Sequence, residues 1–260
     1  MRWPKRQTAE LLDLFLTEDM PWPFLEIVLI AALALPVLGF GLVRSGSTES
    51  TAVQAVEVVV TSSFLSVTLF TFLIMKNMAF GICQALHSGE WAVYMSYPVS
   101  RRRLFVLRLA SAWILPMTLY LFGFWIALWA AVPSLVLAEP KLVFITTLGT
   151  LQPMLLLASF ISLLSLKLRE GSSALFAGFI LYIVYQTLAQ IVTLVAILAP
   201  SSWIMVLRGV LQPSVTLADY AGRGDPNSLL SFIGFLGFGI ALSVAIAAIA
   251  MKTFTSKSSV

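Results

Sequence analysis

Few side chains in this sequence are suited to catalysis. Cys83 is the only cysteine and His87 the only histidine among 260 residues, so neither an intrachain disulfide nor a structural zinc site is expected. The H-E-x-x-H pattern of zinc proteases is absent, and so is the G-x-x-x-x-G-K-[ST] phosphate loop of ATPases. We therefore expect no catalytic residue and no metal ligand in this chain, and its recognition chemistry becomes the main question.

The densest group of binding side chains lies in the segment 83–103. Four of them stand out: Glu90, Trp91, Tyr94 and Met95. The last three fall at i, i+3 and i+4, which places them on one face of a short helix. Ser88 is expected to cap this helix and Pro98 to end it. Because Trp, Tyr and Met are enriched in protein interfaces, the segment is predicted to dock on a partner.

Three consecutive arginines follow this segment. Arg101, Arg102 and Arg103 open a long apolar helix that Ser100 is expected to cap. Cations at that end of a helix are unfavourable by a few tenths of a kcal/mol to about 1 kcal/mol. Binding of anionic lipid head groups, at about 1 kcal/mol per arginine, offsets this penalty, and docking on an acidic partner surface is the alternative. Head-group binding accounts for the arginines but not for the neighbouring aromatic side chains.

A second polar group lies far along the chain. Tyr182, Gln186 and Gln190 recur at i, i+4 and i+8, and Thr193 lies close to the same helical face. Polar side chains on one face of a helix in lipid usually contact protein or water. This stripe is either a translocation pathway or a seam between subunits, or it forms ordinary hydrogen bonds between helices of one bundle. The sequence leaves these alternatives open.

The composition identifies the solvent around most of the chain as lipid. Hydrophobic residues make up 59% and charged residues 11%, whereas soluble domains have about 25% charged residues. The mean hydropathy is +0.96. The charges lie between apolar runs, so we interpret them as topology signals and not as a nucleic-acid surface. We expect an all-α integral membrane protein with six spans, at about residues 23–43, 56–82, 104–132, 142–166, 174–199 and 229–251.

The basic residues predict the orientation of these spans. Six spans place both termini on one side of the membrane, together with the loops after the second and fourth spans. Twelve of the sixteen lysines and arginines lie on that side, so the positive-inside rule places both termini in the cytoplasm of a cell-membrane protein. None of the spans has a charged residue at its centre, which argues against an ion-driven carrier.

Two segments are not predicted to span. The first, residues 1–22, contains a helix at residues 6–20 that is expected to lie in the cytoplasmic interface. Its apolar stripe consists of Leu11, Leu12, Phe15 and Leu16. The second, residues 200–227, is too polar and too interrupted to span, and we expect it to form a short re-entrant or amphipathic segment on the external side, directly before the last span. A polar tail and a flexible external loop are the alternatives.

The layout and one motif resemble the permease subunit of ABC-2 type ABC transporters. In that family the loop between spans two and three carries an acid, a short coupling helix and a P-[small or aliphatic]-S-R turn into span three. This chain has "SGEWAVYMSYPVSRRRLFVLRL" from Ser88 to Leu109. Its acid, Glu90, follows Gly89, whereas the family more often has the acid before the glycine. The segment 200–227 is similar to the family's external re-entrant hairpin.

The resemblance implies an ATP-driven exporter whose region 23–260 forms the translocation path. It also implies a second permease copy, identical or similar, and a separate ATPase subunit that binds ATP and Mg²⁺, so this chain itself would carry no cofactor. The residues expected to couple to that subunit are Glu90, Trp91, Tyr94, Met95, Arg101 and Arg102. A non-transporting scaffold or assembly protein is the main alternative, and a secondary carrier is a further one.

Overall fold

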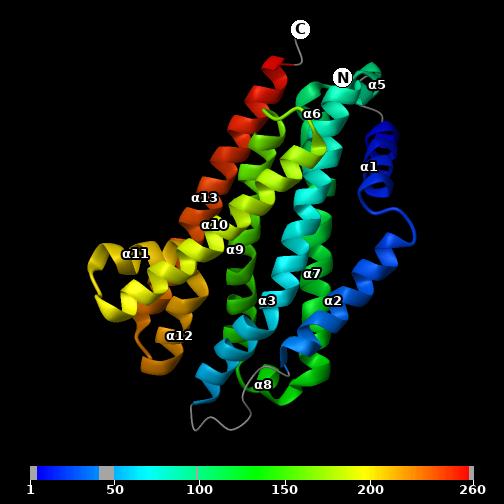
Figure 1. Ribbon diagram of the computed structural model, residues 1–260. Coiled ribbons are helices and arrows are strands. Elements are labelled where there is room, and N and C mark those ends of the chain that lie inside the picture. The colour runs from blue at the N-terminus through cyan, green and yellow to red at the C-terminus, as the bar shows by residue number, and fades with distance from the viewer. Residues whose placement is uncertain (1–4, 41–49, 98, 258–260) are drawn as a thin grey trace.

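The computed structural model describes residues 5–40, 50–97 and 99–257, and every element in this part of the chain is a helix. The expected all-α class is therefore confirmed. The long helices stand side by side in one bundle. Helix α1 (Lys5–Asp19) lies on one flank of the bundle, and α11 (Ser202–Leu211) and α12 (Pro213–Arg223) lie on the other (Figure 1). Residues 41–43 of the first expected span, and Pro98, which was expected to end the short helix, lie outside the described residues.

Five helical stretches within the described residues are long and apolar enough to cross a membrane. Two are compound: α3 (Thr51–Met78), η1 (Ala79–Gln84) and α4 (Ala85–Ser88) form one, and α6 (Arg101–Leu109), η2 (Ala110–Ile114) and α7 (Leu115–Ala131) form the other. The other three are α9 (Pro140–Ser165), α10 (Gly171–Leu198) and α13 (Pro226–Lys257). The pair α1 (Lys5–Asp19) and α2 (Phe24–Phe40), bent by 72°, makes six if it is counted as one span. The chain is a multi-pass membrane protein with five to six such helices.

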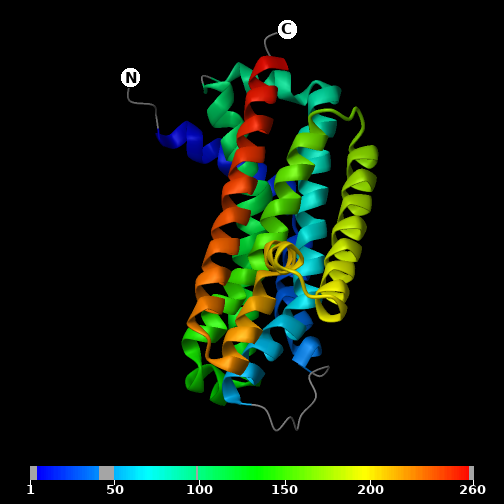
Figure 2. The same cartoon turned by 90° about the vertical axis from the view of Figure 1, so that its left-hand side faces the viewer.

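Burial separates the central helices from the outer ones. In the apolar part of α9, 67% of the residues are buried, and 56% in the stretch that contains α3, against 28% in α10 and 22% in α13. The helices α3 and α9 pack against each other, with α2 on one side and α13 on the other. Figure 2 shows α10 at the edge of the bundle. Its outer face carries exposed apolar side chains, which must meet lipid or another protein.

The first helix, α1, packs on the bundle. The expected helix is confirmed, but Leu11 and Phe15 of its apolar stripe are buried in the protein, and α1 contacts α6 and η2. Leu12 and Leu16 are partly buried. Half of the stripe is therefore covered by other helices and not by lipid. The periodicity located the apolar face correctly but could not say what covers it.

A sharp turn separates α4 from α5 (Glu90–Ser96). Gly89 lies between them with φ of +84°, a left-handed conformation that costs other residues about 1–2 kcal/mol. The cap position expected for Ser88 is occupied by Gly89. Ser88 lies one residue earlier, and its Oγ still accepts a long hydrogen bond of 3.5 Å from the Glu90 amide at the start of α5. The expected cap at Ser100 is confirmed, since its Oγ accepts a hydrogen bond from the Arg103 amide at 3.4 Å.

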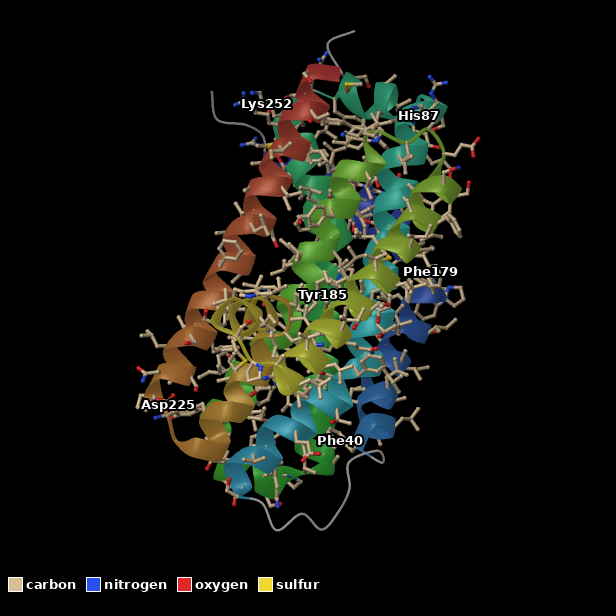
Figure 3. All side chains as sticks on the ribbon, turned by 60° about the vertical axis from the view of Figure 1, so that its left-hand side comes forward. Phe40, His87, Phe179, Tyr185, Asp225 and Lys252 are labelled. Carbon is tan, nitrogen blue, oxygen red and sulfur yellow. The ribbon has the colours of Figure 1, made fainter. Side chains whose placement is uncertain are left out.

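The expected segment 200–227 forms a helical hairpin of α11 (Ser202–Leu211) and α12 (Pro213–Arg223). The hairpin packs on α3, α9, α10 and α13. A further short helix, α8 (Pro133–Ala138), joins α7 to α9 and was not expected from the sequence. Figure 3 places His87 and Lys252 at one end of the molecule and Asp225 and Phe40 toward the other. The segment with α5 and the connection from the hairpin to α13 therefore lie at opposite ends.

Candidate functional site

The short helix α5 turns its two largest side chains toward the bundle. Trp91 is 1% exposed and Tyr94 is 8% exposed. The Trp91 ring packs on Phe254 of α13 with 4.9 Å between ring centroids, and the Tyr94 ring packs edge-on against Phe15 of α1 at 5.2 Å. Trp91 and Tyr94 thus hold α5 on the bundle, which corrects the expectation that they form its outer docking surface.

The outer face of α5 consists of other residues. Val93 is 62% exposed, Glu90 and Tyr97 are exposed, and Met95 is partly buried. The neighbouring side chains of Arg101, Arg102 and Arg103 are exposed as well. Of the residues expected to contact a partner, Glu90, Arg101 and Arg102 are therefore accessible. Val93 and Tyr97 add an apolar and an aromatic contact that the sequence pattern did not single out.

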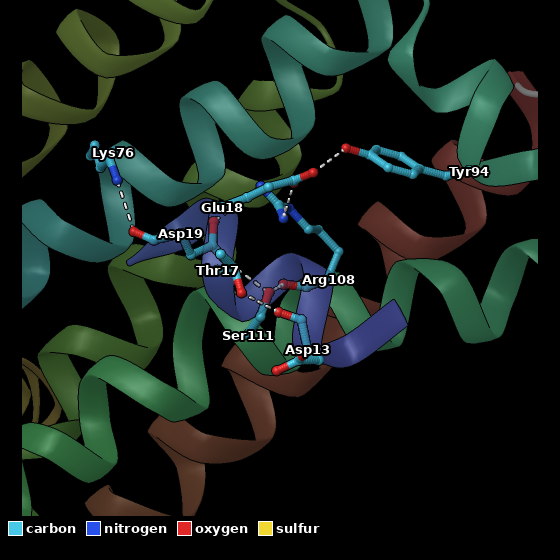
Figure 4. A network of polar contacts seen from close by, with 8 residues as sticks. All are labelled: Asp13, Thr17, Glu18, Asp19, Lys76, Tyr94, Arg108 and Ser111. Carbon is cyan, nitrogen blue, oxygen red and sulfur yellow. Dashed lines mark hydrogen bonds and ion pairs between the residues drawn. The ribbon is translucent and has the colours of Figure 1, made fainter. Parts of the chain in front are cut away.

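A buried ion cluster lies beneath α5 (Figure 4). The side chain of Arg108 is 4% exposed, and its guanidinium contacts Glu18 Oε2 and Asp19 Oδ1, both at 3.0 Å. The Ser111 hydroxyl donates to Asp19 Oδ2 at 2.7 Å. The guanidinium also lies over the Phe15 ring, 4.9 Å from its centroid, an attractive cation–π geometry. One arginine of α6 therefore fixes the C-terminal end of α1.

Two further contacts extend the cluster to α3 and α5. The Tyr94 hydroxyl donates to Glu18 Oε1 at 2.5 Å, and the Lys76 ammonium donates to the Asp19 carbonyl at 2.9 Å (Figure 4). Burial raises the pKa of Tyr94 above its ordinary value, and the hydrogen bond to Glu18 raises it further. The phenol is therefore a proton donor throughout the physiological range. The end of α1 is thus joined to α3, α5 and α6 by polar contacts.

The backbone is adapted to this cluster. A Cβ at Gly81 would collide with the guanidinium of Arg108, so any larger residue would displace that group. Gly81 belongs to the π-helical segment η1, and Ser111 belongs to the π-helical segment η2. Such segments are rare and frequently occur at functional sites. Here two of them flank one arginine from opposite helices.

A cavity of about 380 Å³ adjoins the cluster. Three acids line it, Glu18, Asp19 and Glu90, together with the cations Lys76 and Arg108. Asn77 also lines it and is 1% exposed, and both its amide nitrogen and its amide oxygen lack a hydrogen-bond partner among the described residues. Buried polar groups of folded proteins are normally paired, so this amide is an unsatisfied polar group at the edge of the cavity.

The polar stripe on α10 divides between the bundle and its surroundings. The Tyr182 hydroxyl shares a hydrogen bond of 2.6 Å with Thr68 of α3, and the Thr193 hydroxyl donates to Gln212 Oε1 at 2.9 Å. Gln186 lines a second cavity of about 160 Å³ beside the hairpin, whereas Gln190 is exposed. Hydrogen bonding between helices therefore accounts for two of the four residues. Gln190 faces away from the bundle.

The hairpin is tied to the long helices by two bonds to its backbone. Gln152 of α9 donates to the Val210 carbonyl at 2.7 Å, and the Tyr185 hydroxyl of α10 donates to the Leu211 carbonyl at 2.6 Å. These carbonyls end α11, where no further helical turn can satisfy them. The two side chains supply the missing donors, which fixes where the hairpin lies on the bundle.

The sequence analysis did not single out Glu18, Asp19, Asn77 or Arg108. A signal existed for Arg108, because it lies within the apolar run 104–132, and an ionisable residue in such a run usually faces protein and has a partner. The partner could not be named, since Glu18 lies 90 positions away along the chain.

Neither protein-family profiles nor curated proteins gave a match to this chain when they were searched. Among the described residues, no group of three or more His, Cys, Asp or Glu side chains could hold a metal ion. The argument for a function therefore starts from the fold and the sites themselves.

Proposed function

We propose that this chain is the permease subunit of an ATP-driven exporter in the cell membrane, of the ABC-2 type that its sequence resembles. The observation that carries the proposal is helix α5. It has seven residues, Trp91 and Tyr94 anchor one face in the bundle, and Val93 and Glu90 leave the other face accessible. A helix this short stabilises little by itself, and its firm anchoring suits a surface that receives force from a partner.

The partner is a separate ATPase subunit that binds ATP and Mg²⁺. Its contact surface includes Glu90, Val93 and Tyr97 of this chain, with Arg101 and Arg102 beside them. Movement of α5 passes to α1 through the Tyr94–Glu18 hydrogen bond, and to α13 through the packing of Trp91 on Phe254. Packed side chains and ion pairs of this kind are the physical means by which distant elements are coupled.

The translocation path runs beside α10 and the hairpin. Gln186 and Gln212 supply amides to the cavity of about 160 Å³, and its described lining contains no charged residue. An uncharged lining suits a substrate without strong net charge, since a buried charge needs a partner. The open apolar face of α10 leaves room for a second copy of the permease.

Both termini face the cytoplasm in this proposal. The positive-inside distribution supports it, and so does the position of α5 beside the end of α13, where Trp91 meets Phe254. An ATPase at that end would then meet its ATP supply. The hairpin lies toward the external side.

Co-purification tests the proposal. Variants of Trp91 or Tyr94 would loosen α5 itself, so the informative change is Val93→Arg on the exposed face, with Val93→Leu as the matched control. A charge placed in a desolvated contact weakens association at least about tenfold. We expect the tagged wild-type chain and Val93→Leu to retain an ATPase subunit and ATP turnover, Val93→Arg to lose both, and all three to melt at the same temperature.

Two results would contradict the proposal. If no ATPase accompanies the wild-type chain after gentle solubilisation, the chain is a scaffold or a carrier. If Val93→Arg retains the ATPase and its turnover, α5 is not the contact surface.

A further inference from the structure

The cavity beside the ion cluster has the chemistry of a ligand site. Its volume of about 380 Å³ falls within the range of small-molecule sites. Arg108 is already engaged by two carboxylates at 3.0 Å each. The Lys76 ammonium donates one hydrogen bond to the Asp19 carbonyl and keeps two further N–H donors. Those donors, the Glu90 carboxylate and the Asn77 amide are the groups that remain for a ligand.

The unpaired amide of Asn77 is the observation that indicates a ligand in this cavity. The residue is 1% exposed, and both its amide atoms lack a protein partner within the described chain. An amide presents two N–H donors and an acceptor oxygen. Leaving them unpaired in a buried position is unfavourable, so the matching molecule must both donate and accept hydrogen bonds.

The charges select the class of that molecule. The lining has three carboxylates against two cationic side chains, so a plain anion such as inorganic phosphate would meet net repulsion. A simple amine, which is positively charged, would instead be repelled by the Lys76 ammonium. A zwitterion satisfies both, with its anionic group at Lys76 and its ammonium at Glu90 and the Asn77 oxygen.

The position of the cavity selects the source. Lys76 and Glu18 belong to the ion cluster, and Glu18 accepts a hydrogen bond from Tyr94 of α5. The cavity therefore lies toward the end of the bundle that carries α5 and the exposed Arg101, Arg102 and Arg103. Lipid head groups occupy that level of a membrane. A primary ammonium has N–H donors for a carboxylate, whereas a trimethylated ammonium has none.

We propose that the cavity formed by Lys76, Asn77 and Glu90 with the Glu18–Arg108 pair binds a phosphate ester that carries a primary ammonium, supplied by an aminophospholipid of the surrounding leaflet. The phosphate lies toward Lys76, and the ammonium donates to Glu90 and to the Asn77 oxygen. This site shares Glu90 with the proposed contact surface for the ATPase, whereas Lys76, Asn77 and the Glu18–Arg108 pair lie outside that surface.

Native mass spectrometry of the purified full-length chain measures this preference directly. Phosphatidylethanolamine, phosphatidylcholine and phosphatidylglycerol with the same acyl chains are added in separate titrations. A charge-assisted hydrogen bond that only the ethanolamine head group can make corresponds to roughly a tenfold difference in affinity. We expect one phosphatidylethanolamine to bind about tenfold more tightly than the other two lipids.

Two variants and a control locate the site. Asn77→Leu removes an amide that has no hydrogen-bond partner among the described residues, and Glu90→Gln changes an exposed side chain, so both are expected to fold. Each should abolish the preference for phosphatidylethanolamine. Glu170→Gln changes an exposed acid that does not line the cavity and should keep it.

A soluble competitor separates the two sources of the ligand. Glycerophosphoethanolamine carries the same head group without acyl chains. Weak competition supports a membrane lipid, whereas binding of the soluble compound as tight as that of the lipid keeps the head-group chemistry but assigns a soluble source. Equal affinity for all three lipids, or an unchanged preference in both Asn77→Leu and Glu90→Gln, would overturn the proposal and leave a cavity filled only by water.

Discussion

Arg108→Met is the perturbation that tests the ion cluster most sharply. Methionine keeps much of the length of the side chain but removes the charge and the donors. Asp19 is 2% exposed, and within the described part of the chain its carboxylate would keep only the Ser111 hydroxyl as a side-chain donor. Breaking a buried ion pair by removing one partner costs about 3–5 kcal/mol. Glu18 adds little to this figure, because its side chain is 34% exposed and can turn to water.

The expected loss can be measured as a melting temperature. For a chain of this size, 1 kcal/mol corresponds to a shift of about 2–4 °C, so Arg108→Met should melt about 6–20 °C below the wild type in lipid nanodiscs. The matched control is Arg102→Met, an exposed arginine on the same helix, which should stay within about 2 °C.

A compensating variant separates charge from packing. Adding Glu18→Gln and Asp19→Asn to Arg108→Met removes the uncompensated charges, and neutral replacements of buried ion clusters are often neutral or stabilising. The triple variant should therefore recover most of the loss. If Arg108→Met alone melts within about 2 °C of the wild type, the arginine is not paired in the way described here. If the triple variant melts as low as Arg108→Met, packing and not charge is responsible.

Three other predictions concern the elements around the cluster and the hairpin. Tyr94→Phe should lower the free energy of unfolding by about 1 kcal/mol, because it removes a hydrogen bond to the partly exposed Glu18. Folding raises the pKa of Tyr94, so the stabilisation by this phenol is complete below about pH 10 and is lost as the pH rises further. Above that pH, the melting temperature of Tyr94→Phe should therefore fall less steeply than that of the wild type. Gly89→Ala should destabilise the protein by about 1–2 kcal/mol, because Gly89 has a positive φ. The control Gly234→Ala, at an open position within α13, should stabilise it by about 0.5–1 kcal/mol. Equal changes in the melting temperatures of the two variants would contradict the backbone explanation. Tyr185→Phe should cost about 1–3 kcal/mol of stability, because the Leu211 carbonyl at the end of α11 loses its donor. Limited proteolysis should then cleave the hairpin faster than in the wild type. An unchanged cleavage rate would show that packing alone holds the hairpin on the bundle.

Much of the fold was predictable because lipid restricts what a chain can do. A backbone in lipid must satisfy its own hydrogen bonds, so apolar runs of sufficient length become helices, and the runs at 142–166 and 174–199 match α9 and α10 within a few residues. The run at 23–43 overlaps the described helix α2, but the sequence did not show that α1 precedes it across a bend of 72°. The short α8 was missed because Pro133 and Pro140 break a single apolar stretch into pieces too short to show a period.

The candidate site was only half predictable. The sequence predicted a short helix between Ser88 and Pro98 and identified its aromatic side chains, because spacing along one helix is a local property. It did not show that Trp91 and Tyr94 point inward, since the rotation of α5 depends on Phe15 and Phe254, which lie far away in the sequence.

By itself, the sequence determined that this protein is helical and embedded in a membrane, and it marked the polar segments between the apolar runs. Those properties follow from composition and from short-range periodicity. Tertiary structure alone decided that Arg108 meets Glu18 and Asp19 and that Asn77 borders a polar cavity. The physical reason is that each contact joins helices whose relative position is set by the packing of the whole bundle, and no local pattern encodes that position.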